Sequence, residues 1–197
     1  MIKLPIKSFY FMRHGETDWN KHHIAMGQSD IPLNERGIEQ AHKAADLLKS
    51  CRFSAIAVSP LKRARQTADI IAKKFSAPIT IVEELKECSW GVMEGQHKGD
   101  GSWLEKWRKN SVIKEAEIFS LFTERVMRGL EKALEHPEEP VLVIAHGGVY
   151  WAIQEALNLP FIDLPNCAPL YHRPPIHENS TWFVYNVDEE EIYDNNP

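Results

Sequence analysis

The stretch Ser8-Phe9-Tyr10-Phe11-Met12-Arg13-His14-Gly15 sets the interpretation of the whole chain. Its first five residues form a short, mostly aromatic and β-prone run, which predicts a buried β-strand. The run ends abruptly at Arg13 and His14, where polar residues begin. Because open α/β sheets bind their ligands at the carboxyl ends of strands, we expect chemistry in the segment that follows this strand.

Runs of the same kind recur along the chain and alternate with helical periodicity. Further strands are predicted at Ala55–Val58, Ile79–Val82, Val141–Ala145 and Trp182–Asn186. One helix is predicted from Asn34, with the apolar face Ile38, Ala41, Ala45 and Leu48. A second is predicted after Ser59-Pro60, interpreted as its N-cap and first residue, with the face Leu61, Ala64, Ala68, Ile71 and Phe75. Two more are predicted over Phe119, Phe122, Val126, Leu130 and Ala133, and over Val149–Leu157.

This alternation decides the fold class. Parallel strands need crossover connections, and helical crossovers cover both faces of the sheet. We therefore predict a three-layer α/β/α fold with a mostly parallel central sheet. No interior stretch has the composition of a linker, so residues 1–197 are predicted to form a single domain. The hydrophobic fraction of 43% and the charged fraction of 26% are typical of globular proteins and exclude a disordered or collagen-like chain.

Charge and cysteine usage limit the partners and the compartment. The net charge of −5 argues against nucleic acid or an anionic membrane surface as a partner. The longest N-terminal apolar run, Phe9–Met12, is too short for a signal peptide or a membrane span. Three scattered cysteines form no CxxC pair, which favours free thiols in a reducing, cytoplasmic compartment. Nothing in the pattern sets the oligomeric state.

Three predicted strands end in basic or imidazole residues. The first ends at Arg13-His14, the second leads into Lys62-Arg63-Ala64-Arg65, and the run Val141–Ala145 is followed by His146-Gly147-Gly148. The planar fork of arginine suits phosphate oxygens, and a helix that begins at Gly147 would add backbone N–H groups. If the strand ends meet, they form a phosphate pocket in an otherwise acidic protein. Spacing alone does not distinguish Arg63 from Arg65.

Five blocks of sequence carry a family resemblance. They are Phe11–Asn20, Gly27–Gly37, Ser59–Ala68, Glu84–Glu87 with Gly91–Gly95, and Ala145–Gly148. In this order, from about residue 8 to residue 158, they resemble the motifs of the histidine phosphatase superfamily, in the branch that contains the cofactor-dependent phosphoglycerate mutases. The resemblance implies a phosphoglycerate mutase-like fold.

The resemblance also implies roles for individual residues. His14 would be the nucleophile that forms a phosphohistidine, and it must be neutral to attack. Arg13, Arg63 (selected by the motif) and His146 would hold the phosphoryl oxygens and stabilise their charge. Glu87 would protonate the leaving oxygen and then deprotonate the attacking water. A carboxyl in that role requires shielding from water, so we expect Glu87 to be partly buried.

The remaining predicted site residues contact the phosphate or the leaving group. The full phosphate- and substrate-binding set is Arg13, Asn20, Gly27, Gln28, Arg63, His146 and Gly147. Neither a metal nor a cofactor is expected, because the arginines supply the positive charge. No pair of histidines has metal-ligand spacing such as HExxH.

Two departures from the mutase pattern favour a phosphatase. The stretch Cys88–Gly95 reads CSWGVMEG, which is closer to small phosphatases than to mutases, and a short segment follows Gly95 where mutases carry a longer insertion. We therefore expect hydrolysis of a small phosphorylated metabolite. A cofactor-dependent phosphoglycerate mutase and a non-catalytic sensor of phosphorylated ligands are the alternatives. Residues 96–117 and the proline-rich residues 163–179 are expected to form cap or lid segments that set the substrate.

Overall fold

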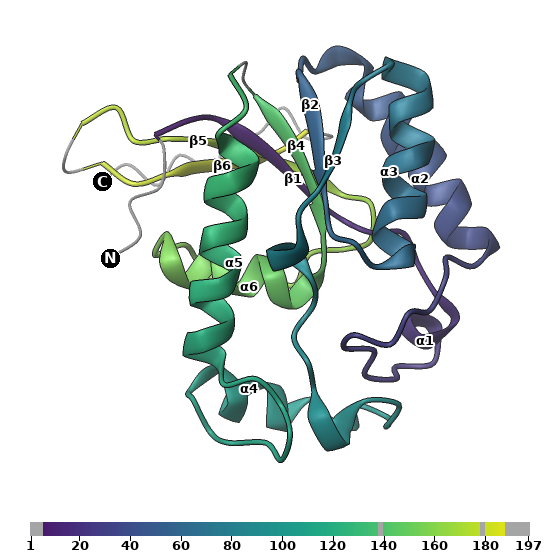
Figure 1. The fold of residues 1–197 in the computed structure, drawn as a ribbon, viewed down its shortest axis with the longest axis vertical. Coiled ribbons are helices and arrows are strands. Elements are labelled where there is room, and N and C mark those ends of the chain that lie inside the picture. Colours follow the sequence, from purple (N-terminus) through teal and green to yellow (C-terminus); the bar gives the residue numbers. More distant parts are fainter. Residues whose placement is uncertain (1–5, 138–139, 178–179, 188–197) are drawn as a thin grey trace.

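The structure is a computed structural model, and it describes residues 6–137, 140–177 and 180–187 (Figure 1). Its strands are β1 (Phe9–Arg13), β2 (Ala55–Val58), β3 (Ile79–Ile81), β4 (Val141–Ala145), β5 (Pro169–Arg173) and β6 (Phe183–Asn186). Its α-helices are α1 (Asp18–Lys21), α2 (Glu35–Leu47), α3 (Lys62–Phe75), α4 (Ser102–Arg108), α5 (Phe119–Leu134) and α6 (Gly147–Ala156). Three short 3₁₀ helices are η1 (Leu48–Ser50), η2 (Glu83–Leu85) and η3 (Gly91–Met93). Within the described ranges, no helix is long and apolar enough to cross a membrane.

The strands form one sheet in the order β3-β2-β4-β1-β5-β6. Strands β3, β2, β4 and β1 pair in parallel, whereas β5 pairs antiparallel with both β1 and β6. Helices α2 and α3 cover one face, and α5 and α6 cover the other (Figure 1). The predicted three-layer α/β/α fold with a mostly parallel sheet is confirmed.

The alternation of side chains along each strand divides the core into two layers. In β1, Phe9 and Phe11 pack with the cluster that includes α5 and α6, while Tyr10 and Met12 pack with the cluster that includes α2 and α3. All four side chains are buried. Strand β1 reads as a continuous apolar run, and not as an alternating one, because both of its faces are covered.

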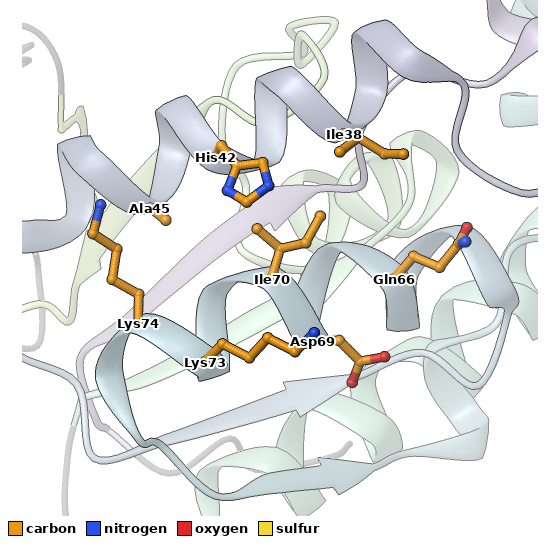
Figure 2. Close-up of a pocket in the computed structure, with 8 residues that line it drawn as sticks. All are labelled: Ile38, His42, Ala45, Gln66, Asp69, Ile70, Lys73 and Lys74. Carbon is orange, nitrogen blue, oxygen red and sulfur yellow. The ribbon is translucent and has the colours of Figure 1, made fainter.

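The helices follow the predicted faces with two differences. Helix α2 starts where predicted, with the Asn34 side chain as its N-cap, but Ile38 on the predicted apolar face is 40% exposed. Its side chain lines an open surface groove between α2 and α3 (Figure 2). The predicted cap of α3 at Ser59 is wrong: the helix begins at Lys62, and its N-cap, Leu61, makes no side-chain cap. The Ser59 hydroxyl lies instead 2.7 Å from Nε2 of His146.

The proline-rich stretch expected to form a loop contains a strand of the central sheet. Residues 169–173 form β5, in which Met12 pairs with Pro169 and Phe9 with His172. Proline is tolerated here because it occupies the first position of the strand. In the rest of the segment expected to form a lid, residues 163–168 border the end of β1. Residues 178–179 lie outside the described ranges.

Candidate active site

The three strand ends that carry the predicted site residues meet. Strand β4 lies between β2 and β1, with Arg13 opposite Ala145 in the register. The His14 amide donates to the Ala145 carbonyl (3.0 Å), and the Ser59 amide donates to the Ile144 carbonyl (3.1 Å). These bonds extend the sheet ladder by one residue beyond each strand. The side chains that follow β1, β2 and β4 are therefore gathered at one end of the sheet.

His14 is held as a neutral imidazole. Its buried ring lies with Nδ1 2.7 Å from the Gly15 carbonyl oxygen, which can only accept, so Nδ1 carries the proton. The Nε–H of Arg63 donates to the other nitrogen, Nε2, at 3.2 Å, so Nε2 presents its lone pair. Burial, followed by the charges of Arg63 and Arg13, lowers the pKa of His14 well below its ordinary value. This protonation state is the one a nucleophile requires.

Arg63 is fully buried and fixed by backbone acceptors. Its Nη1 donates to the Ser29 carbonyl (2.9 Å) and its Nη2 to the Gly27 carbonyl (2.8 Å). Burial lowers the pKa of Arg63 to about 10, and the nearby carboxylate of Glu87 opposes that shift. Arg65 is exposed on the outer side of the same helical turn. The structure therefore distinguishes the two arginines that spacing leaves equivalent.

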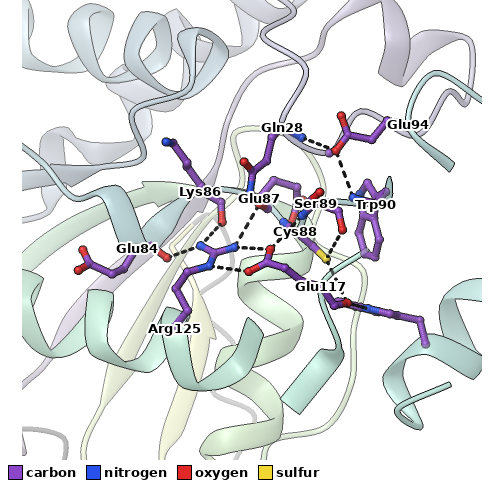
Figure 3. A network of polar contacts seen from close by, with 12 residues as sticks. Gln28, Glu84, Lys86, Glu87, Cys88, Ser89, Trp90, Glu94, Glu117 and Arg125 are labelled. Carbon is purple, nitrogen blue, oxygen red and sulfur yellow. Dashed lines mark hydrogen bonds and ion pairs between the residues drawn. The ribbon is translucent and has the colours of Figure 1, made fainter. Parts of the chain in front are cut away.

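The loop that receives Arg63 is itself held by Glu94. One carboxylate oxygen, Oε1, accepts from the Gln28 amide at 3.1 Å (Figure 3). The other, Oε2, accepts from the Ser29 hydroxyl at 3.1 Å. Gly27 has φ of 51°, in the left-handed region, and a side chain there would overlap the Glu94 carboxylate. Glycine is thus required both by the backbone and by the close approach of Glu94.

Arg13 and His146 present unused polar atoms toward the same region. Arg13 donates from Nη1 to the Leu164 carbonyl (3.0 Å), and the His146 ring centre lies 5.2 Å from that of His14. Among the described residues, neither Arg13 Nε nor His146 Nδ1 has a hydrogen-bond partner, although both atoms are buried. A Cβ on Gly147 would lie 3.7 Å from Arg13 Nε, which places the start of α6 beside this guanidinium. Buried atoms of this kind are commonly satisfied by a ligand or by water.

Glu87 lies across the site at the beginning of α6. Its carboxylate accepts from the Gly148 amide through Oε2 (3.1 Å) and from the Cys88 amide through Oε1 (2.9 Å). The residue is 9% exposed, so the expected partial burial is confirmed. A carboxyl so placed can exchange a proton with a group that occupies the space between α6 and the end of β1.

Asn20 and Gln28 make contacts that the sequence did not predict. Asn20 forms a capping box with Thr17 at the start of α1, which engages its Oδ1 at 3.2 Å from the Thr17 amide. Gln28 is exposed, and its Nε2 donates to the Glu87 carbonyl (3.2 Å). Both residues therefore have a structural contact in addition to the binding role expected of them.

Sequence reasoning missed a third cation beside the site. Lys98 is half-buried, and burial, with repulsion from Arg13, lowers the pKa of its ammonium group. The negative charges of Glu87 and Asp163 oppose this shift. The one available signal was its position within residues 96–117, which were expected to border the pocket. Among the described residues, no group of three or more histidines, cysteines or carboxylates could hold a metal ion.

A phosphoryl group fits this arrangement. Its oxygens would face Arg13 Nε, Arg63 Nε and His146 Nδ1, while its phosphorus would face His14 Nε2. The model of the histidine phosphatase superfamily (branch 1) matches residues 9–170. The chain belongs to this superfamily. The match runs from the start of β1 into β5 and includes every site residue described above.

Relatives in the superfamily carry both phosphatase and mutase names. The chain is 36% identical over 143 residues to the uncharacterised phosphatase PhoE of Bacillus subtilis, covering 72% of each protein. It is 35% identical over 147 residues to the probable phosphoglycerate mutase GpmB of Escherichia coli, covering 70% of this chain and 68% of that protein.

Solved structures of the superfamily share the fold. A mycobacterial glucosyl-3-phosphoglycerate phosphatase complexed with VO3 superimposes with a TM-score of 0.77 at 25% identity, covering 91% of this chain and 98% of that one. A putative alpha-ribazole-5'-P phosphatase from Escherichia coli gives a TM-score of 0.73 at 26% identity, covering 87% and 92%. Small phosphorylated compounds appear in both names.

Proposed function

We propose that this protein is a metal-independent phosphomonoesterase that hydrolyses a small phosphorylated metabolite through a phosphohistidine on His14. One observation carries the proposal. The Nε2 lone pair of a neutral, buried histidine accepts from the guanidinium of Arg63, and the charge of Arg13 acts on the same ring. Histidine attack on phosphorus needs that lone pair, and the transferred oxygens need that charge.

In the first step, the His14 Nε2 lone pair forms a bond to phosphorus. The ester bond between phosphorus and the leaving oxygen breaks, and Glu87 supplies the proton that this oxygen takes. The Nδ1–H bond to the Gly15 carbonyl stabilises the positive charge that develops on the imidazole. Arg13, Arg63 and His146 stabilise the charge on the equatorial oxygens, as positively charged groups do in phosphoryl transfer generally.

In the second step, water replaces the leaving alcohol. The Glu87 carboxylate takes a proton from the water as its oxygen bonds to phosphorus, and the phosphorus–nitrogen bond breaks. Inorganic phosphate leaves, and His14 and Glu87 return to their starting protonation states. The overall reaction consumes one ester and one water and produces one alcohol and one phosphate.

Two features support hydrolysis over phosphoryl return to a bound intermediate. The first is the sequence CSWGVMEG of residues 88–95, which resembles small phosphatases more than mutases. Its Glu94 also holds the loop of residues 27–29. The second is the short segment 96–117, which forms only one seven-residue helix, α4.

The three cysteines are all free thiols, which agrees with a cytoplasmic enzyme.

The testing experiment measures phosphate release in the presence of EDTA, from sugar phosphates, phosphoglycerates, nucleotides and an aryl phosphate. Wild type and His14→Ala run side by side. We expect EDTA-resistant release that is lost in the variant. A requirement for added Mg²⁺, or a fully active His14→Ala protein, would contradict the proposal.

The same preparation separates the alternatives. A mutase would isomerise 3-phosphoglycerate, with stimulation by 2,3-bisphosphoglycerate, faster than it releases phosphate. A sensor would bind phosphoesters without turnover. Either result would replace the phosphatase.

A further inference from the structure

The segment that carries Glu87 is docked along one face of α5. The segment approaches the helix closely at Gly129, where an added Cβ would lie 2.8 Å from Cβ of Glu84. Lys132 forms an ion pair with the Glu84 carboxylate, and Leu85 is fully buried against the helix cluster. Residues 125, 129 and 132 are spaced so that they share one face of the helix.

Arg125 provides the polar part of this contact. Its Nη1 donates to the carbonyl oxygens of Glu84 (2.8 Å) and Lys86 (3.0 Å), and its Nη2 donates to that of Glu87 (3.3 Å) (Figure 3). One guanidinium therefore binds three carbonyls within four consecutive residues. The last of the three belongs to Glu87 itself.

The other edge of the guanidinium is fixed by Glu117. The Nε and Nη2 atoms of Arg125 donate to the two carboxylate oxygens of Glu117, at 2.9 and 2.7 Å. Such a two-bond pair holds the guanidinium plane in one orientation. Glu117 also accepts from the Ser89 amide (2.9 Å), so the pair contacts the chain on both sides of Glu87 (Figure 3).

The pair is shielded, and its charges cancel. The side chains of Arg125 and Glu117 are 18% and 27% exposed. A lone guanidinium beside a general acid would favour the ionised carboxylate and oppose proton donation. Glu117, paired with Arg125 at 2.7 Å, offsets part of that charge while Arg125 holds the backbone.

We propose that Arg125, oriented by Glu117, is a positioning residue for Glu87, an inference that rests on the function proposed above. Arg125 binds the Glu87 carbonyl, whereas the carboxylate oxygens of Glu87 accept from the amides of Gly148 and Cys88. The backbone at Glu87 is fixed by α5 and the carboxylate by α6. Both attachments are required to hold the proton donor at the leaving oxygen.

The test uses leaving groups that differ in their need for a proton. An alkyl alkoxide leaves only when protonated, whereas nitrophenolate leaves without a proton. With an alkyl phosphate, Arg125→Met is expected to lower kcat about 100-fold, the scale of a misplacement of about 1 Å, with KM unchanged. The first-turnover burst of nitrophenol from 4-nitrophenyl phosphate is expected to keep its wild-type rate.

Three further variants complete the experiment. Glu117→Gln keeps the side-chain shape and leaves the carbonyl contacts of Arg125 in place. It is therefore expected to lower kcat on the alkyl phosphate by less than Arg125→Met does, again without slowing the nitrophenol burst. Arg125→Lys keeps the charge but not the planar fork, so it is not expected to restore the alkyl phosphate rate. Arg128→Met, at an exposed position one turn along α5, is the matched control and is expected to behave as wild type.

Two results would overturn the inference. One is an equal loss on both substrates together with a lowered midpoint of thermal unfolding, which indicates a role in stability alone. The other is full recovery in Arg125→Lys, which indicates that charge alone matters. If wild type shows no EDTA-resistant hydrolysis, the proposed function fails instead and this inference fails with it.

Discussion

The Nε–H of Arg63 donates to Nε2 of His14 across 3.2 Å. The same guanidinium is fixed at its far edge by the carbonyls of Gly27 and Ser29. The imidazole is therefore held in one tautomer before any substrate arrives, with its lone pair directed at a cation. When a phosphoryl group enters, its phosphorus takes the lone pair and one of its oxygens takes the N–H.

Arg63→Lys is expected to lower kcat/KM about 100- to 1,000-fold, the usual scale for loss of one preorganised donor to a transition state. A lysine keeps the charge, but a single ammonium cannot reach His14 and both loop carbonyls at once. Steady-state kinetics on an aryl phosphate measure the loss.

Arg65→Lys is the matched control for this prediction. Arg65 lies two positions along α3 and is exposed, so its substitution is expected to leave kcat/KM within error of wild type. Equal losses in the two variants would show that the position of Arg63 beside His14 has no kinetic consequence.

Gly148→Ala is expected to displace the Glu87 carboxylate. A methyl group at this position would overlap Oε1 and lie 3.1 Å from Cδ, and the Gly148 amide is the donor to Oε2. We expect kcat on an alkyl phosphate to fall about 100-fold, because general acid catalysis depends on hydrogen-bond reach.

Gly147→Ala is the neighbouring comparison. Its methyl group would lie 3.7 Å from Arg13 Nε, an ordinary contact distance, so a smaller loss is expected. Kinetics on alkyl and aryl phosphates separate the two positions. A larger effect at Gly147 than at Gly148 would show that close approach to Glu87 does not limit the rate.

Most of the fold could be predicted because its central strands are buried on both faces. The runs at Phe9, Ala55 and Val141 are short, apolar and followed by polar residues, and they became β1, β2 and β4. Strand β5 could not be predicted, because Pro169 at its start and Pro174 and Pro175 after its end indicate a loop. It forms through pairing with β1, in which Tyr171 lies opposite Tyr10, and local sequence does not encode that partner.

The site shows the same division. Arg13 ends β1, and His14 and His146 directly follow β1 and β4, so the sheet gathers them at one end. The choice between Arg63 and Arg65 depends on which faces His14, and spacing within one helical turn does not settle that. Arg125 was missed because the carbonyls that it binds at Glu84 and Lys86 lie about 40 residues away, and carbonyls carry no signal in the sequence.

Inorganic phosphate is expected to stabilise the folded chain. It would supply acceptors for Arg13 Nε and His146 Nδ1, which lack partners in the described part of the chain. A ligand that binds only the folded state adds about 2.7 kcal/mol to the free energy of unfolding at 100 times its Kd. Thermal unfolding across a phosphate titration in EDTA measures the effect.

Arg13→Gln is the comparison for the phosphate titration. The amide keeps polarity but loses the charge and the Nε donor, so the rise in the unfolding midpoint is expected to disappear. Chloride at matched ionic strength controls for screening. A rise of equal size in Arg13→Gln and wild type would place the bound phosphate elsewhere.

The free energy of unfolding is expected to fall as the pH drops below about 6.5, the ordinary histidine pKa of the unfolded chain. Burial lowers the pKa of His14 and His146 well below that value, and that of His172 to about 3. In this window the unfolded chain binds protons that the folded chain does not, so each ring removes about 1.4 kcal/mol of the free energy of unfolding per pH unit.

His172→Gln, whose amide can still bond the Tyr150 hydroxyl, should make the slope of the free energy of unfolding against pH shallower by one proton, measured by urea unfolding between pH 7 and 5. The exposed His42→Gln should leave it unchanged, and equal slopes in His172→Gln and wild type would contradict the assignment.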